Sequence, residues 1–402
     1  MVNHFGKYND YFDIDSEYFP QVNRQIIEEN PDLWLKYYPH ESFVKLIEAT
    51  VRVLNRSEKK ALWVEGAYGT GKSHAVLTLK KLIDADDAAA QKYFGQNDDL
   101  LSADLFQKFV SMRRQGGRIL TVHRYGSSDI RSDDDLNMAV YQSLVEALAR
   151  HPDLRNPQAS FKDGVIEWLK TPRNRRYLGD LLVEYRDKVK LNGANVDEVE
   201  RLLTTARGEA LESVLRELMI IGREANIGIF KLDKEQLLGW IGDIIRENHL
   251  RILFVWDEFS EFFKNNMRSM TGFQRFADFA GEQPFYMLIV THHTANLFSS
   301  DRDARKIFDR FVRVSIELPP HMGFKLIGKA LQRNKAYAKD WEELQSDQRS
   351  NTKLSRNAVM KYAKVDDDDL RSILPIHPYT AVVLKEISAA FASNQRSMFD
   401  FI

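Results

Sequence analysis

Residues 63–77 read WVEGAYGTGKSHAVL, and this stretch decides the fold. The apolar run ALWVE at Ala61–Glu65 stops at glycines, and apolar residues recur at helical spacing directly after them. This order predicts a strand, a tight loop and a helix. Residues 66–73 fit G-x-x-x-x-G-K-[ST], which in this context is typical of a loop that binds nucleotide phosphates. The alternative is a glycine turn ahead of an ordinary helix.

The residue types of this loop suit phosphate chemistry. Glycines allow backbone N–H groups to converge on the β-phosphate, and the next helix adds the positive end of its dipole. We expect Lys72 to neutralise β- and γ-phosphate oxygens and the Ser73 hydroxyl to bind Mg²⁺, so that ATP and Mg²⁺ are the predicted cofactors. The predicted nucleotide-binding residues are Gly66, Ala67, Tyr68, Gly69, Thr70, Gly71, Lys72, Ser73 and His74. The pattern leaves position 68 free.

Hydrolysis requires an acidic pair at the end of a neighbouring strand, and residues 251–259, RILFVWDEF, provide one. We expect Asp257 to hold the metal through water and Glu258 to orient and deprotonate the attacking water. The alternative is two charges at the solvated end of a strand. The pair follows Lys72 by 185 residues, which is long for a compact domain, so the helical block before residue 250 is predicted to be an insertion.

Three further residues are candidates for catalysis. Thr291 and His292 end an apolar strand, and because successive strand residues face opposite sides, only one of them is expected to point at the nucleotide. Arg310 directly precedes the last predicted strand, where it would stabilise transition-state charge on a nucleotide held by an adjacent subunit. The alternatives are an ordinary strand end and a solvated arginine.

Strands that alternate with helices predict an α/β fold with a parallel sheet. The predicted strands cover residues 61–65, 118–126, 251–259, 285–293 and 311–318. We expect an aromatic-rich extension at 1–40, a core domain at 41–320 with a helical insertion at about 151–250, and a helical lid at 321–402. The chain ends on the apolar run MFDFI, so we expect it to continue in a longer protein.

Composition excludes several classes of protein. The chain has 402 residues, and its 57 lysines and arginines nearly balance 58 aspartates and glutamates, so charge does not indicate DNA binding. The absence of cysteine excludes a disulfide framework and suits a reducing cytoplasm. No apolar run is long enough for a membrane span. We predict a cytoplasmic protein without a membrane partner.

Other polar residues carry weaker predictions. His40 lies either near the adenine ring or in a structural position at a helix start, and Arg371 or Arg396 is a candidate phosphate sensor in the lid. The run VDDDDL at residues 365–370 is interpreted as a solvated loop, because consecutive aspartates cannot all face one ion. The histidines show no H-E-x-x-H spacing, so no separate metal centre is predicted.

The order of these motifs resembles that of AAA+ P-loop ATPases, with GAYGTGKS as Walker A, ILFVWDE as Walker B and VTHH as sensor 1. In this resemblance Arg310 takes the arginine-finger position. The resemblance covers about residues 41–320 with a helical lid beyond. It implies the strand order 5-1-4-3-2, nucleotide bound between core and lid, and a homo-oligomer.

A narrower resemblance rests on GAYGTGKSH, LPIHPYTAVVLKEIS and NQRSMFDFI. These stretches are similar to those of the large P-loop ATPases of bacterial antiphage defence, of the BREX and phage-growth-limitation type. Those proteins are longer than this chain. The resemblance implies protein partners from a defence system and an association with DNA.

Three functions remain open at this level. The first is an ATPase that converts ATP and water to ADP and phosphate and couples nucleotide state to oligomerisation and to remodelling or control of a partner. The second is a STAND-type signalling switch that holds its nucleotide. The third is an adaptor that the nucleotide stabilises without significant turnover.

Overall fold

The computed structural model describes residues 8–14, 32–58, 60–67, 70–157, 161–189, 191, 195–230, 234–266, 271–292, 308–317 and 322–383. The chain divides into two compact units. The first unit comprises Met1–Glu48, Val64–Gln107 and Val314–Ile402, and the second comprises Ala49–Trp63 and Lys108–Arg313. The divisions fall inside regular elements, so strand β2 (Ala61–Glu65) begins in the second unit and ends in the first.

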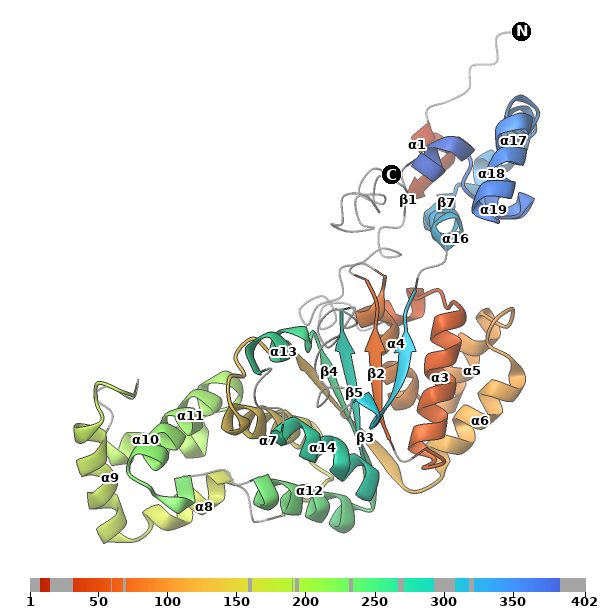
Figure 1. Ribbon diagram of the computed structural model, residues 1–402. Helices are drawn as coiled ribbons and strands as arrows, with labels where there is room; N and C mark the ends of the chain where they lie inside the picture. Colours follow the sequence, from red (N-terminus) through yellow and green to blue (C-terminus); the bar gives the residue numbers. More distant parts are fainter. Residues whose placement is uncertain are drawn as a thin grey trace. The chain divides into compact units, whose positions relative to one another are not determined.

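A five-stranded parallel sheet organises the fold (Figure 1). Its strands are β2, β3 (Arg118–Tyr125), β4 (Leu250–Asp257), β5 (Phe285–Thr291) and β6 (Phe311–Ser315), in the order β3-β4-β5-β2-β6. The predicted α/β fold with a parallel sheet is confirmed. Counted along the chain, the strand order is also the 5-1-4-3-2 that the resemblance implies.

Burial explains which strands are central. Every residue of β4 and β5 is buried, as expected for strands covered on both faces, whereas the edge strand β3 is only partly buried. In the register of the sheet, Tyr125 lies opposite Asp257, and Trp256 lies opposite Ile289. β3 ends before Gly126, whose φ of 75° turns the chain away from extended geometry.

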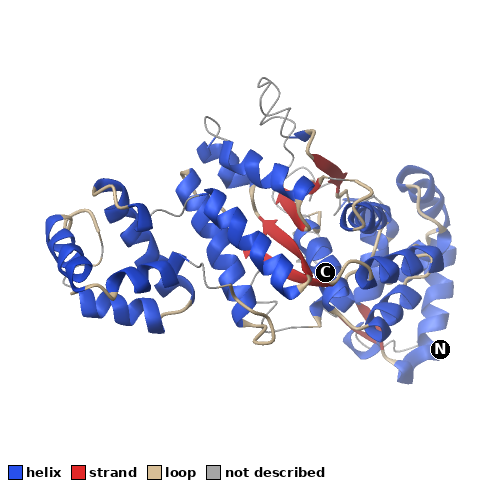
Figure 2. Cartoon of the chain, turned by 90° about the horizontal axis from the view of Figure 1, so that it is seen from below, coloured by secondary structure: helices blue, strands red, loops and turns tan. Residues whose placement is uncertain are grey.

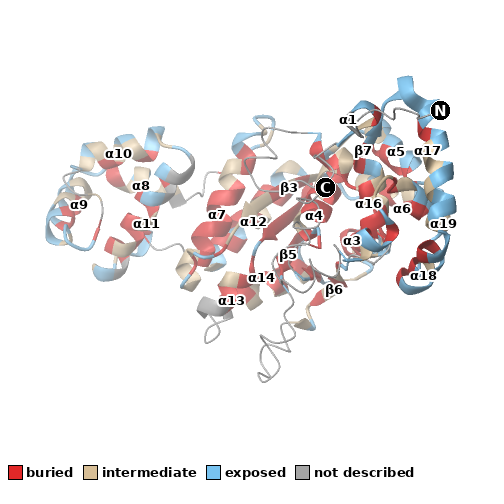
Figure 3. Ribbon diagram, turned by 90° about the horizontal axis from the view of Figure 1, so that it is seen from above, coloured by how far each residue is buried: buried red, intermediate tan, exposed pale blue. Residues whose placement is uncertain are grey.

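Besides the ends of two helices that begin in the first unit, further helices make up most of the rest of the second unit as far as it is described (Figures 2 and 3). They are α7 (Asp133–Ala149), α8 (Phe161–Leu169), α9 (Pro172–Glu184), α10 (Val196–Thr205), α11 (Gly208–Glu224), α12 (Lys234–Asn248), α13 (Ser260–Asn266) and α14 (Thr271–Glu282), with a short 3-10 helix, η3, at Gly228–Phe230. One buried apolar cluster runs from the sheet through α7 into α8–α12. Regular structure described between residues 151 and 249 is thus helical, as the sequence predicted.

The first unit contains the helices on either side of the loop at residues 66–73. They are the 3-10 helix η2 (Leu33–Lys36), the start of α3 (Glu41–Leu54), α4 (Lys72–Asp84), α5 (Asp87–Gln96) and the start of α6 (Ala103–Arg114). Its later part comprises α16 (Met322–Ala330), β7 (Leu331–Arg333), η4 (Lys335–Tyr337), α17 (Ala338–Asn351), α18 (Lys353–Ala363) and α19 (Asp367–Ser372). Strand β1 (Phe12–Ile14), which follows the short helix α1 (Tyr8–Tyr11), pairs antiparallel with β7.

The interpretation of residues 365–370 as a solvated loop is wrong. The aspartates begin α19, where the Asp366 side chain accepts from the N–H of Asp369 and the Asp369 side chain accepts from the N–H of Asp366. This capping box satisfies backbone donors at the helix start, and the negative charges suit the helix dipole. Asp367 pairs with Arg349 and Arg356 of the preceding helices.

The described helices include none with the length and apolar character that crossing a membrane requires.

Candidate functional site

The close approach of β6 explains the first glycine of the loop. A Cβ atom on Gly66 would lie 2.3 Å from the carbonyl oxygen of Ile316, which is closer than real Cβ contacts allow. The N–H of Ile316 donates to the carbonyl of Glu65 at 2.7 Å, so the end of β6 fixes the point where β2 becomes the loop. Packing alone therefore requires a glycine at position 66.

The lysine at the end of the loop forms a hydrogen bond with the backbone of the loop itself. Gly71 has a φ of 82° and precedes α4, and Lys72 and Ser73 begin that helix. The Lys72 Nζ donates to the carbonyl of Ala67 at 2.7 Å, and the Thr70 hydroxyl donates to the same carbonyl at 2.9 Å. The ammonium therefore lies at the loop, where phosphate oxygens would replace a carbonyl as acceptor. Tyr68 and Gly69 lie outside the described residues.

This arrangement fits a nucleotide phosphate. The loop offers a lysine, a left-handed glycine and the N-terminus of a 13-residue helix, which are the components that bind phosphate in loop-to-helix sites. Ser73 and Asp257 have the hard oxygen donors that Mg²⁺ prefers. Within the described ranges, the structure gathers no group of three or more histidine, aspartate or glutamate side chains for a separate metal.

His74, predicted to bind nucleotide, has its ring engaged elsewhere in the first unit. Its Nε2 lies 3.3 Å from the carbonyl oxygen of Leu33, and its ring packs edge-on against Tyr37 with centroids 4.9 Å apart. Burial lowers the pKa of His74 to about 4, although the hydrogen bond to Leu33 opposes this shift. The neutral ring therefore donates from Nε2 and attaches residues 33–37 to α4.

His40 belongs to the same aromatic cluster. It is buried, and its Nε2 lies 3.0 Å from the hydroxyl of Tyr37. Tyr37 also packs edge-on against Phe43, and its carbonyl accepts the hydroxyl of Tyr93 at 2.7 Å. Burial raises the pKa of Tyr37 well above its ordinary value, so its hydroxyl stays neutral. These contacts fit the structural alternative for His40.

The acidic pair, Asp257 and Glu258, lies at the end of β4, and the second residue has an unusual backbone conformation. Asp257 is 2 % exposed, whereas Glu258 is exposed and has a φ of 55°, in the left-handed region. The carboxylate of Asp257 accepts the N–H of Glu258 at 2.8 Å. The two carboxylates thus differ: one is buried at the strand end, and the other is turned into solvent.

Neighbouring strands hold this turn in place. The N–H of Gly126, after β3, donates to the carbonyl of Asp257 at 3.0 Å, and the hydroxyl of Ser127 donates to the carbonyl of Glu258 at 3.1 Å. On the other side, the N–H of Phe259 donates to the carbonyl of Val290 in β5 at 2.9 Å. We call residues 257–262 the acidic turn.

The two candidates at the end of β5 differ as the strand geometry predicts. Thr291 is 1 % exposed, and its hydroxyl oxygen accepts the indole N–H of Trp63 at 2.9 Å. His292 is exposed, and its backbone N–H donates to the hydroxyl of Ser260 at 2.8 Å. Trp63 lies three residues before Gly66, so Thr291 contacts the strand that leads into the loop.

Arg310 interacts within its own chain. Its Nε forms an ion pair with Asp278 of α14, and its carbonyl accepts the N–H of Ala61 at 2.9 Å. An action of Arg310 on an adjacent subunit would therefore require release from Asp278. Of the lid candidates, Arg371 lies 3.6 Å from the carboxylate of Asp368, and Arg396 lies outside the described residues.

Sequence reasoning missed Ser127 and Trp63, which bind the ends of β4 and β5. Residues 125–129 read YGSSD, a polar stretch after a strand, and this was the available signal for Ser127. The indole of Trp63 gave none, because nothing local distinguishes it from an apolar core residue.

Comparison with known proteins gave no relatives: no family model matches the chain, and no curated protein and no solved structure matches it.

Proposed function

We propose that this chain is a P-loop ATPase that binds ATP with Mg²⁺ and hydrolyses it to ADP and phosphate. The observation that carries the proposal is the loop at residues 66–73, which lies between a buried strand and a helix with Lys72 bonded to the loop backbone. In this proposal Lys72 neutralises phosphate oxygens and Ser73 contributes a metal ligand.

The acidic turn supplies the hydrolytic half of the proposed mechanism. Asp257, buried at the end of β4, would hold the metal with its carboxylate, the kind of oxygen ligand that Mg²⁺ prefers. Glu258 is the general base that takes the proton of the attacking water, and the exposure of its side chain supports this role. Thr291 is favoured over His292 as the sensing residue, because its hydroxyl is hydrogen-bonded to Trp63, in the strand that leads into the loop.

The AAA+ assignment and its biological setting are also proposals. They rest on the motif order and on the strand order β3-β4-β5-β2-β6, which agrees with that resemblance. We propose that ATP turnover is coupled to homo-oligomerisation and to control of a partner in DNA-associated antiphage defence, in the cytoplasm. Arg310 would act in trans after release from Asp278.

Steady-state hydrolysis tests the ATPase. Glu258→Gln should bind ATP and turn it over at least ~10²-fold more slowly, as expected for loss of a general base. Lys72→Ala should lose ATP binding itself. Glu247→Gln is the matched control, because Glu247 is an exposed carboxylate on α12. Unchanged turnover in Glu258→Gln would refute the mechanism.

The remaining two functions are outcomes of the same measurement. Nucleotide that is retained through purification, with negligible turnover and slow exchange, would replace the ATPase by a STAND-type switch. Bound nucleotide without turnover, in a protein whose state does not respond to it, would indicate an adaptor.

Mixed subunits test the role of Arg310. Arg310→Ala and Lys72→Ala should each be inactive alone, whereas their mixture should regain activity if an intact Arg310 completes a site that has an intact Lys72. A mixture as inactive as its parts, under conditions where light scattering shows oligomers, would exclude action in trans.

A further inference from the structure

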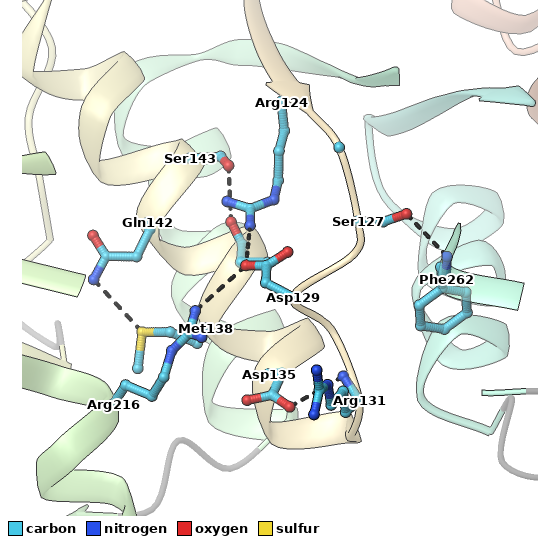
Figure 4. A network of polar contacts seen from close by, with 12 residues as sticks. Arg124, Ser127, Asp129, Arg131, Asp135, Met138, Gln142, Ser143, Arg216 and Phe262 are labelled. Carbon is cyan, nitrogen blue, oxygen red and sulfur yellow. Dashed lines mark hydrogen bonds and ion pairs between the residues drawn. The ribbon is translucent and has the colours of Figure 1, made fainter. Parts of the chain in front are cut away.

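The loop between β3 and α7, residues 126–132, is one of the neighbours that hold the acidic turn. Ser127 is fully buried, and its hydroxyl donates to the carbonyl of Glu258. The same hydroxyl accepts the N–H of Phe262 at 3.0 Å (Figure 4). The carbonyl of Gly126 accepts the indole N–H of Trp256 at 2.8 Å. One serine thus connects both ends of the segment that carries Glu258.

This connection matters because Glu258 has a strained backbone. A non-glycine residue at a φ of 55° persists only where the surrounding contacts determine it. Its N–H is bound by Asp257 and its carbonyl by Ser127, so the hydrogen bonds on either side of the residue hold this conformation. Loss of the Ser127 hydroxyl would remove this hydrogen bond to the carbonyl of Glu258. The Glu258 side chain would then no longer be held in one direction.

The same loop is tied to the helical segment. Asp129 accepts from Arg124 of β3 at 3.0 Å and from Arg216 of α11 at 3.4 Å, both at Oδ2 (Figure 4). The Arg124 guanidinium lies over the ring of Trp256, 5.5 Å from its centroid. Arg216 therefore reaches from the helices that follow residue 151 to the loop that contacts Glu258.

Hydrogen bonds attach the far end of the loop to α7. Ser132 caps α7 by accepting the N–H of Asp135, and the Asp135 carboxylate accepts the N–H of Arg131 at 3.2 Å and the Ser132 hydroxyl at 2.9 Å (Figure 4). With this end fixed by α7, the charged contacts of Asp129 determine how the loop presents Ser127.

We infer that Ser127 is a positioning residue for Glu258, and that Arg216, through Asp129, couples helix α11 to it. This inference rests on the proposed ATPase function.

The test separates turnover from binding. Ser127→Ala should lower kcat ~10-fold, a part of what loss of a general base costs, and change the affinity for a fluorescent ATP analogue by less than ~2-fold. In the Glu258→Gln background the same substitution should lower kcat no further, because Ser127 acts through Glu258. Ser127→Thr, which keeps the hydroxyl, should recover part of the rate.

Arg216→Gln and Asp129→Asn test the coupling without a change in the buried hydroxyl. Each should lower kcat ~3-fold or more at unchanged analogue affinity, a smaller part of the same loss. Arg201→Gln is the matched control, since Arg201 lies on α10 in an exposed pair with Glu198. These variants also keep the inference testable if Ser127→Ala does not fold.

The outcomes distinguish this inference from the proposed function. If Glu258→Gln abolishes turnover while Ser127→Ala, Arg216→Gln and Asp129→Asn match the unsubstituted chain, the inference is wrong and the ATPase stands. An equal loss from Ser127→Ala in both backgrounds would make Ser127 structural. If the unsubstituted chain does not hydrolyse ATP, both fail.

Discussion

His74 shows how a residue beside a predicted phosphate-binding motif can stabilise the fold. The ring is buried, donates to the carbonyl of Leu33 and packs against Tyr37. A charged imidazole would lose its hydration there, and burial accordingly lowers its pKa from 6.5 to about 4. The neutral ring therefore stabilises the folded state, and this contribution is lost as the pH falls toward values at which the ring is protonated.

The stability of the first unit should therefore depend on pH through His74. Between pH 6.5 and about 4 the unfolded chain binds a proton that the folded chain does not, so the free energy of unfolding falls as pH falls through this window. The full effect is ~3 kcal/mol, with ~2 kcal/mol lost by pH 5. Urea unfolding at pH 7 and pH 5 measures it.

His74→Gln should remove most of this dependence, because an amide can donate to Leu33 without titrating. The control is His377→Gln, an exposed histidine of the same unit. A pH dependence that survives His74→Gln unchanged would show that other groups cause it.

At the scale of single residues, the sequence carries predictions only where the pattern is local. The spacing of Gly66, Gly71 and Lys72 is itself the pattern of a phosphate-binding loop. Thr291 is hydrogen-bonded to residue 63 and Glu258 to residue 127, and in both pairs the two residues are more than 100 positions apart in the sequence. No sequence pattern encodes those hydrogen bonds, because they form only when the strands align.

Among the elements, α6 and β4 are joined by one buried arginine. Arg251 is 3 % exposed, and its guanidinium donates to the carbonyls of Met112, Arg113 and Gly117 at 2.9–3.1 Å. The carbonyls of Met112 and Arg113 lie in the last turn of α6, where they have no backbone N–H of the same helix to accept. A positive charge there also suits the helix dipole. Arg251 thus replaces the hydrogen bonds that the helix end cannot make.

Arg251→Met should destabilise the second unit by ~2–4 kcal/mol, because it leaves buried carbonyls without a donor. Arg150→Met is the control: that side chain is 65 % exposed and lies 3.9 Å from Glu146, so its effect should stay within ~0.5 kcal/mol. Urea unfolding of both variants measures the difference. Equal effects would mean that solvent satisfies the carbonyls of α6.

Elements were predictable from sequence where their apolar pattern is strong. β4 and β5 are built around the apolar runs at residues 252–256 and 285–290, and the helix predicted at Glu41–Leu54 has those bounds in the structure. The pairing of β1 with β7 and the helix at Asp367–Ser372 were missed. A three-residue strand carries no periodicity, and four consecutive aspartates indicate a helix start only when the capping geometry is known.

For the whole molecule, strand order followed from the resemblance, whereas the division into two units did not. The cuts fall within α3, β2, α6 and β6 rather than at linkers, so composition along the chain gives no sign of them. The loop at residues 66–73 belongs to the first unit and the acidic turn to the second. An ATPase of the proposed kind must use both.

Hydrogen exchange with and without ATP and Mg²⁺ tests this requirement, in the Glu258→Gln variant so that the nucleotide persists. Ligand at 100-fold its Kd stabilises the bound state by ~2.7 kcal/mol, enough to slow exchange measurably where binding orders the backbone. We expect protection at the start of α4 and in the acidic turn together, and neither in Lys72→Ala. Protection of α4 alone would mean that the second unit does not respond to nucleotide, which favours the adaptor over the ATPase.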